Sequence, residues 1–211
     1  MRHTDQFSRL VRQVAIRRSA LLKSSLRQDI LPPAGSVWYP SQEELARTDA
    51  FVVFFIAELE NYFEDVIESA LNIYQEGIIA SGLANCGAGP GYVQTILDKR
   101  KLLAKNNNTG WDRTSQYWTF VGLNKGVFPV NLWDNVDFVT SERGAIVHRS
   151  LGLRVITDPR LTVSRVRRII RQLRLFDRDF FHWQSHRAIE LARLNISQAK
   201  FLPGIGMIST S

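Results

Sequence analysis

The sequence predicts an all-α protein, a helical bundle of four or more core helices with an extra N-terminal helix and connecting loops. Two long segments carry this prediction, because apolar residues recur in both at helical spacing: residues 48–74, which contain no Gly or Pro, and residues 163–180. Few stretches alternate polar and apolar residues as a half-buried strand would. The 211 residues are expected to form a single domain, 1–211, with its core at about 41–181.

The N-terminal region, residues 1–28, is rich in Arg and Ser and has one acidic residue. Its apolar residues recur at helical spacing, which predicts a basic amphipathic helix over 4–28. The same composition is typical of a transit peptide, and that alternative stays open. Residues 29–40 contain three prolines and should end this helix. Ser41 followed by Glu44 predicts a capping box at the start of the next.

The segment 48–74 changes character along its length. Its first half contains "AFVVFFIA" (50–57), which is apolar on nearly all sides and predicts a central, buried helix. The same stretch motivates a symmetric dimer. Its second half is amphipathic, and one face carries the polar residues Glu60, Asn61, Glu64, Asp65 and Glu68.

The middle of the chain gives weaker signals. Residues 81–91 read as a glycine-rich loop that lacks the Lys-Ser/Thr of a phosphate-binding P-loop. Residues 92–105 are expected to be helical, and 112–139 mix aromatic residues, Gly and Pro in a way that allows a short strand. The segment 132–151 should be helical in part, and 202–211 form a tail.

The net charge is +7 with an isoelectric point near 9.9, which favours a polyanionic partner, nucleic acid before a membrane surface. No apolar run approaches the roughly 20 residues needed to span a bilayer, so no membrane partner is expected. The single cysteine, Cys86, excludes an internal disulfide framework and fits a reducing compartment, the cytoplasm.

Charge is segregated along the chain. Residues 43–76 hold nine acidic residues against one base, whereas 160–178 hold seven arginines. Such a basic stripe is either a solvated helix face or a contact surface for RNA. The stripe on the last helix consists of Arg167, Arg171, Arg174 and Arg178.

The segment "SERGAIVHRS" (141–150) places His148 five residues after Arg143. On one straight helix two such residues point about 140° apart and share no face. Either the helix begins or bends near Arg143, with Ser141 as its N-cap and Gly144 allowing the bend, or two chains build the site together.

The chemistry of this pair is that of metal-independent RNA cleavage. A histidine transfers protons near neutral pH, and an arginine binds phosphate through paired, charge-assisted hydrogen bonds. A general base and a phosphate clamp suffice for attack of an RNA 2′-hydroxyl on its own phosphate, so no metal and no cofactor are expected. His182 and His186 have the spacing of metal ligands on a helix but lack an evident third ligand beyond Glu190.

The motif Arg143-"GAIV"-His148, the acidic-faced helix before it and the basic helix after it resemble the HEPN superfamily, most closely its RiboL-PSP-type branch. The resemblance implies a HEPN-type bundle and an endoribonuclease in which two motifs face each other across a homodimer. It implies a toxin, antiphage or RNA-processing role, with a cognate antitoxin or defence protein as partner. Gly144 departs from the polar residue that many members have after the Arg, and Arg149 and Ser150 replace the Gly and Tyr found after the His.

Further site residues are expected around the motif. Glu60, Ser141 and Glu142 are candidate supporting residues, and Arg149 and Arg154 are candidate RNA contacts beside the arginine stripe. Two other functions remain open at this point. One is a non-catalytic RNA-binding HEPN module. The other is a helical interaction protein that docks a partner through its acidic helix.

Overall fold

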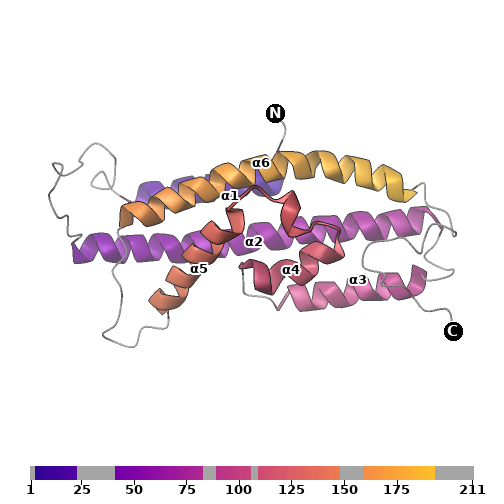
Figure 1. The fold of residues 1–211 in the computed structure, drawn as a ribbon, viewed down its shortest axis with the longest axis horizontal. Coiled ribbons are helices and arrows are strands. Elements are labelled where there is room, and N and C mark those ends of the chain that lie inside the picture. The colour runs from indigo at the N-terminus through magenta and orange to yellow at the C-terminus, as the bar shows by residue number, and fades with distance from the viewer. Residues whose placement is uncertain (1–2, 23–40, 83–88, 106–108, 148–158, 193–211) are drawn as a thin grey trace.

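A computed structural model describes residues 3–22, 41–82, 89–105, 109–147 and 159–192. In chain order the elements are α1 (Asp5–Leu21), α2 (Gln42–Ala80), α3 (Gly89–Leu103), α4 (Trp111–Phe120), the 3-10 turn η3 (Lys125–Val127), α5 (Leu132–Val147) and α6 (Pro159–Ala192). These ranges contain helices and no strand, which confirms the predicted all-α class (Figure 1).

Helix α2 is the centre of the bundle, and α1, α3, α5 and α6 all pack against it (Figure 1). The predicted capping box starts it: the Ser41 hydroxyl accepts from the Glu44 N–H at 3.2 Å, and the Glu44 carboxylate accepts from the Ser41 N–H at 2.8 Å. A cap of this kind stabilises a helix by about 1 kcal/mol. The helix begins earlier than residues 48–74 because its first turn is polar and carries no apolar signal. It ends later because it continues through Gly77, a residue that disfavours helix in the sequence.

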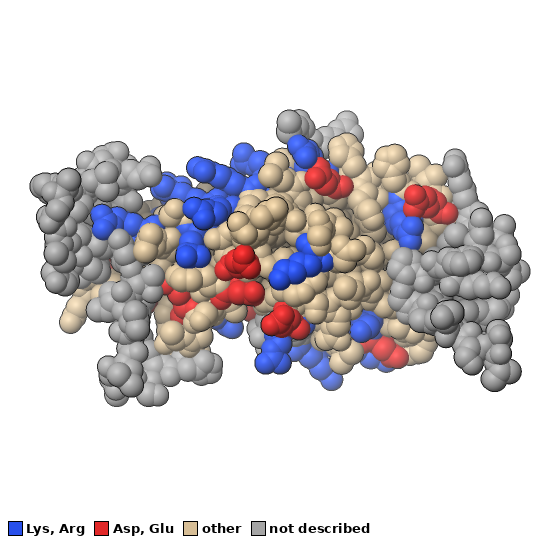
Figure 2. Space-filling view, in the orientation of Figure 1, with Lys and Arg blue, Asp and Glu red and all other residues tan. Residues whose placement is uncertain are grey.

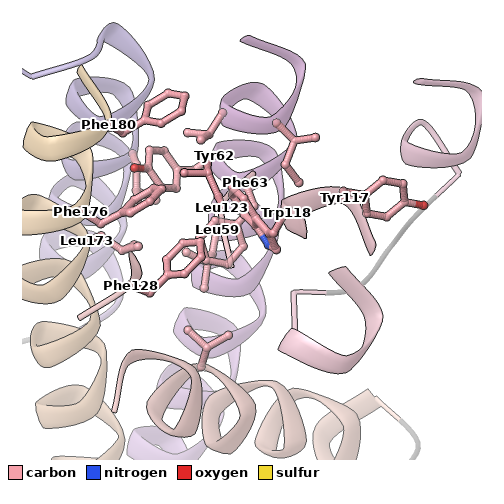
Figure 3. Packing of buried hydrophobic residues seen from close by; sticks show 14 of the residues in the cluster. Leu59, Tyr62, Phe63, Tyr117, Trp118, Leu123, Phe128, Leu173, Phe176 and Phe180 are labelled. Atoms are coloured by element: carbon pink, nitrogen blue, oxygen red, sulfur yellow. The ribbon is translucent and has the colours of Figure 1, made fainter. Parts of the chain in front are cut away.

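The core is one continuous cluster in which aromatic side chains dominate. Leu59, Tyr62 and Phe63 of α2 point toward Leu173, Phe176 and Phe180 of α6 (Figure 3). Trp118 of α4 packs edge-on against Phe63, with ring centroids 5.5 Å apart. Aromatic pairs of this geometry contribute about 0.5–1.5 kcal/mol beyond their buried area.

The region 112–139, where the sequence allows a short strand, contains none. Thr114, Tyr117 and Trp118 are buried at helical spacing on α4. The helix ends at Phe120, and Gly122 follows with a φ of 80°, the left-handed conformation that glycine adopts without strain. The Leu123 N–H then donates to the Trp118 carbonyl at 2.8 Å, which closes the turn. The β-favouring aromatic residues are helical here because they pack on α2, and packing overrides propensity.

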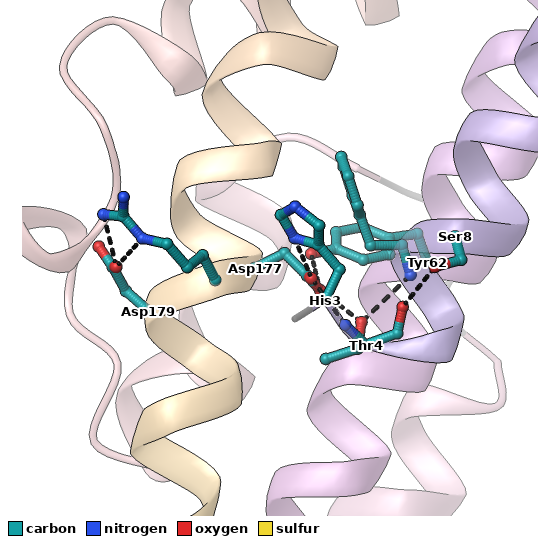
Figure 4. A network of polar contacts seen from close by, with 8 residues as sticks. His3, Thr4, Ser8, Tyr62, Asp177 and Asp179 are labelled. Atoms are coloured by element: carbon teal, nitrogen blue, oxygen red, sulfur yellow. Dashed lines mark hydrogen bonds and ion pairs between the residues drawn. The ribbon is translucent and has the colours of Figure 1, made fainter. Parts of the chain in front are cut away.

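A buried polar cluster ties the N-terminus to α6. Asp177 is fully buried, and its carboxylate accepts from the Thr4 N–H at 2.9 Å, from the Thr4 hydroxyl and from the Tyr62 hydroxyl at 3.2 Å (Figure 4). His3 Nδ1 lies 3.2 Å from the same carboxylate. The Thr4 hydroxyl also caps α1 by accepting from the Phe7 N–H at 3.1 Å. This cluster fixes α1 antiparallel to α6.

Candidate functional site

Helix α5 carries Arg143 near its C-terminal end and is continuous from Leu132 to Val147. Ser141 lies exposed inside the helix, so its predicted role as an N-cap is wrong. Gly144 is also helical, so it does not interrupt the helix. A Cβ added at Gly144 would meet no atom within 4 Å, so no close approach requires glycine either. Local start and bend signals are overridden here by the packing of α5 on α2 and α6.

Arg143 and Glu60 are brought together by α5 and α2. Arg143 Nη1 lies 3.8 Å from Glu60 Oε1, an ion pair at a distance too long for a hydrogen bond. The Arg143 side chain is 34% exposed and that of Glu60 is 15% exposed. Glu60 Oε1 is buried and has no hydrogen-bond donor among the described residues. The pair therefore has binding capacity that its own contacts leave unused.

The electrostatics of Glu60 are set by burial against a nearby cation. Burial raises the pKa of Glu60 above its ordinary value, and the guanidinium of Arg143 counteracts part of this shift. One turn later, burial also raises the pKa of Glu64, and the neighbouring carboxylates of Glu60 and Asp65 raise it further. Electrostatic attraction to the acidic face of α2 therefore holds the Arg143 guanidinium beside Glu60.

The acidic face of α2 pairs with arginines of the same chain. Besides the Glu60–Arg143 contact, Asp65 Oδ2 lies 3.1 Å from Arg9 Nη2 of α1. Glu68 Oε1 lies 2.8 Å from Arg100 Nε of α3. Three acids of this face thus bridge α2 to three different helices, and they are not gathered for an outside partner.

The remaining residues of the predicted motif fall in two groups. Glu142 accepts from the Thr162 hydroxyl at 3.0 Å and so links α5 to the start of α6. This contact gives Glu142 a role in positioning the two helices. His148, Arg149 and Arg154 lie outside the described residues, so their roles stay predictions.

The four arginines of the α6 stripe lie in two different surroundings. Arg167, Arg171 and Arg174 line a groove between α1 and α6, joined by Arg18 of α1, which the sequence analysis did not single out. Arg178 instead pairs with Asp179 at 2.8 Å. Lys and Arg side chains gather in the upper left of Figure 2, where the first half of α6 lies. Their assignment as RNA contacts stays a prediction.

The other candidates carry no site in the structure. His182 and His186 are exposed on α6, and no three metal-ligating side chains cluster anywhere in the described ranges. Within those ranges, no helix has the length and apolar character needed to cross a membrane. In the stretch 50–57, Phe51, Phe55 and Ile56 are buried in the core of the chain, whereas Phe54 is 39% exposed and lies 4.5 Å below the guanidinium of Arg17.

Sequence reasoning missed the pairing of α1 with α6. Asp177 falls among the core positions of α6, between Phe176 and Phe180, and an acid at a core position is a signal for a buried polar contact. Its partners, Thr4 and Tyr62, lie more than 100 residues away, and spacing along the chain gives no indication of them.

Comparison with known proteins adds no family or fold relative. No family model, no curated protein and no solved structure matches the chain. The case for function therefore depends on the residues and their geometry.

Proposed function

We propose that the chain is a metal-independent endoribonuclease of HEPN type, in which Arg143 binds the scissile phosphate and His148 transfers the proton. One observation carries this proposal: Arg143 is half-buried, held by the Glu60 carboxylate, and still partly open to solvent. An arginine that only supports the fold is expected to use more of its hydrogen-bonding capacity within the chain. Among the described residues, Arg143 makes no polar contact other than this ion pair.

Helix α5 ends at Val147, and His148 follows it directly in the sequence. On one straight helix, residues five apart point about 140° apart. A site built by two chains does not need both residues on one face of one helix. This favours a site completed by a second copy of the chain, and a homodimer is part of the proposal.

In the proposed reaction, His148 removes the proton of the RNA 2′-hydroxyl, which attacks the adjacent phosphorus. Arg143 stabilises the charge that develops on the non-bridging oxygens. Glu60 orients Arg143 without touching the RNA. The 5′-oxygen leaves and takes a proton from water, and the product ends in a 2′,3′-cyclic phosphate.

The biological setting that fits such an enzyme is a toxin, a defence effector or an RNA-processing factor, with an antitoxin or defence protein as partner. The alternative of a non-catalytic RNA-binding module shares the same contacts and lacks only cleavage. The alternative of an interaction protein that docks a partner through the acidic helix is disfavoured, because Asp65 and Glu68 pair within the chain.

The test is incubation of the purified protein with total RNA in EDTA, followed by mapping of the product ends. The proposal predicts cleavage that survives EDTA and leaves 2′,3′-cyclic phosphates. Binding of RNA without cleavage would select the non-catalytic module, and cleavage that requires a divalent metal would contradict the mechanism.

A further inference from the structure

A groove of about 470 Å³ lies between α1 and α6. Its apolar lining comes from three helices, and its polar lining is entirely arginine. The lining residues are Val11, Val14, Ala15 and Arg18 of α1, Phe51 of α2, and Val163, Val166, Arg167, Ile170, Arg171 and Arg174 of α6. We infer that this groove binds an acidic amphipathic helix of a partner protein.

The groove lies on the side of α6 away from α5 and Arg143. Arg165 of α6 stacks over Phe138 of α5, 3.7 Å from the ring centroid, so this residue marks the α5 side. Arg167 follows two residues later, which turns it about 200° around the helix. The groove is thus separate from the candidate active site, and the inference does not rest on the proposed function.

The arginines of the groove carry like charges that repel one another. Among the described residues, no acidic side chain forms an ion pair with Arg18, Arg167, Arg171 or Arg174. Burial lowers the pKa of Arg167, and the nearby charges of Arg18 and Arg171 lower it further. A ligand carrying carboxylates would relieve this repulsion, and charge complementarity therefore selects an anionic partner.

The side chains on the floor of the groove favour an acidic protein over RNA as its ligand. Proteins that bind single-stranded RNA stack its bases on aromatic side chains. Here the lining between the arginines is aliphatic, and the single aromatic ring, Phe51, is only 1% exposed. An aliphatic floor instead suits Leu, Ile or Val side chains, the apolar anchors of a helix laid into a groove.

The chain itself offers no suitable occupant. Residues 193–211 contain no acidic residue, and residues 23–40 contain one acid against two bases. The acidic face of α2 is engaged with arginines of α1, α3 and α5. The complementary charge must therefore come from another protein.

The dimensions define the ligand. The lining of α6 runs from Val163 to Arg174, and 11 residues of helix rise about 16 Å, or three turns. The partner segment should therefore be a helix of three to four turns with apolar residues at i, i+3, i+4 and i+7. Glu or Asp should flank this apolar stripe and meet the arginines on both walls.

The experiment uses the full chain and a fluorescein-labelled peptide of about 16 residues, with Leu at these positions and Glu beside them. The control is a scrambled peptide of equal composition, in which the Leu residues no longer lie on one face of the helix. Fluorescence anisotropy is measured for the wild type, Arg171→Glu and Arg168→Glu, because Arg168 is exposed on α6 outside the groove and gives the same charge change. Ala15→Phe, at an exposed position of the groove, fills it without removing a charge, with Ala15→Ser as its control.

The inference predicts that the peptide binds and that the scrambled peptide binds at least about tenfold more weakly. It predicts a loss of about tenfold or more for Arg171→Glu and Ala15→Phe, and less than about twofold for the two controls. Equal binding of both peptides, or affinity unchanged by Arg171→Glu and Ala15→Phe, would overturn it. A competition with oligouridylate gives a further outcome that would overturn it. If oligouridylate displaces the peptide, and if Arg171→Glu but not Arg168→Glu abolishes oligouridylate binding, the groove is a nucleic-acid site.

Discussion

Two polar sites of this bundle differ in how completely their hydrogen-bonding groups are paired within the chain. Asp177 is fully buried and accepts hydrogen bonds from Thr4 and Tyr62, with His3 beside it. Glu60 and Arg143 are partly exposed, stand 3.8 Å apart, and leave Glu60 Oε1 without a donor among the described residues. A closed network of the first kind fixes the fold. An open one of the second kind retains capacity for a ligand.

The difference also appears in the pKa directions. Burial and the carboxylate of Asp177 raise the pKa of Tyr62 well above its ordinary value, so the phenol remains a donor at any physiological pH. Burial raises the pKa of Glu60 as well, but Arg143 opposes this shift. The Tyr62 donor of the first cluster therefore keeps its proton throughout the neutral range, whereas the second site depends on a charge pair that substitution can break.

The largest effect is expected at Arg143. Arg143→Ala should lower EDTA-resistant RNA cleavage by about 100- to 1,000-fold, because it removes a donor that stabilises the transition state. Arg143→Lys should restore little of the rate, since an ammonium group does not make the paired contact with phosphate. The rate is measured per folded molecule at saturating RNA. Cleavage by Arg143→Ala at the wild-type rate would assign the site to structure alone.

The closed cluster should respond in the opposite way. Asp177→Ala should lower the free energy of unfolding by about 3 kcal/mol, because it leaves the buried donors of Thr4 and Tyr62 unpaired. Asp179→Ala is the matched control: Asp179 is exposed and pairs with Arg178, and its loss should cost less than about 1 kcal/mol. Urea denaturation measures both. A similar loss in the two variants would contradict the contrast between the sites.

A smaller effect follows from the raised pKa of Glu60. An acid whose pKa is higher in the folded protein than in the unfolded chain lowers stability as pH rises through these values. Arg143 reduces this penalty, so Arg143→Ala should destabilise the protein more at about pH 7.5 than at about pH 3, which is well below the ordinary pKa of a glutamate and leaves Glu60 protonated in both states. The difference should be about 0.5–1 kcal/mol, as for a partly exposed pair. A loss that is equal at both pH values would show that the pair carries no charge coupling.

The smallest effect concerns Gly144. Because α5 is continuous there and a Cβ would meet no atom within 4 Å, Gly144→Ala should stabilise the protein by about 0.5–1 kcal/mol. A thermal melt of the variant measures this gain. A loss of stability would indicate that the conformational freedom of glycine is used at this position after all.

The sequence predicted the fold class and the two long helices, because α2 and α6 bury regular apolar faces whose spacing is visible in the chain. It did not predict the continuity of α5, since Ser141 and Gly144 resemble a helix start and a bend, and packing on α2 and α6 decides otherwise. Glu60 was among the predicted supporting residues, and the structure places it beside Arg143.

The groove between α1 and α6 could not be predicted from the sequence, for a different reason. The stripe of Arg167, Arg171 and Arg174 is visible from helical spacing alone. Arg18 joins it only because α1 lies antiparallel to α6, an arrangement fixed by the contact between Thr4 and Asp177. A tertiary contact between opposite ends of the chain leaves no periodic signal.

The account is tested most directly by His148→Ala, with RNA cleavage in EDTA and the melting temperature measured on the same preparation. If His148 transfers the proton, cleavage should fall by about 100- to 10,000-fold while the melting temperature and RNA binding stay close to those of the wild type. Full cleavage per folded molecule, together with a lowered melting temperature, would make His148 a packing residue and would remove the proposed enzyme activity.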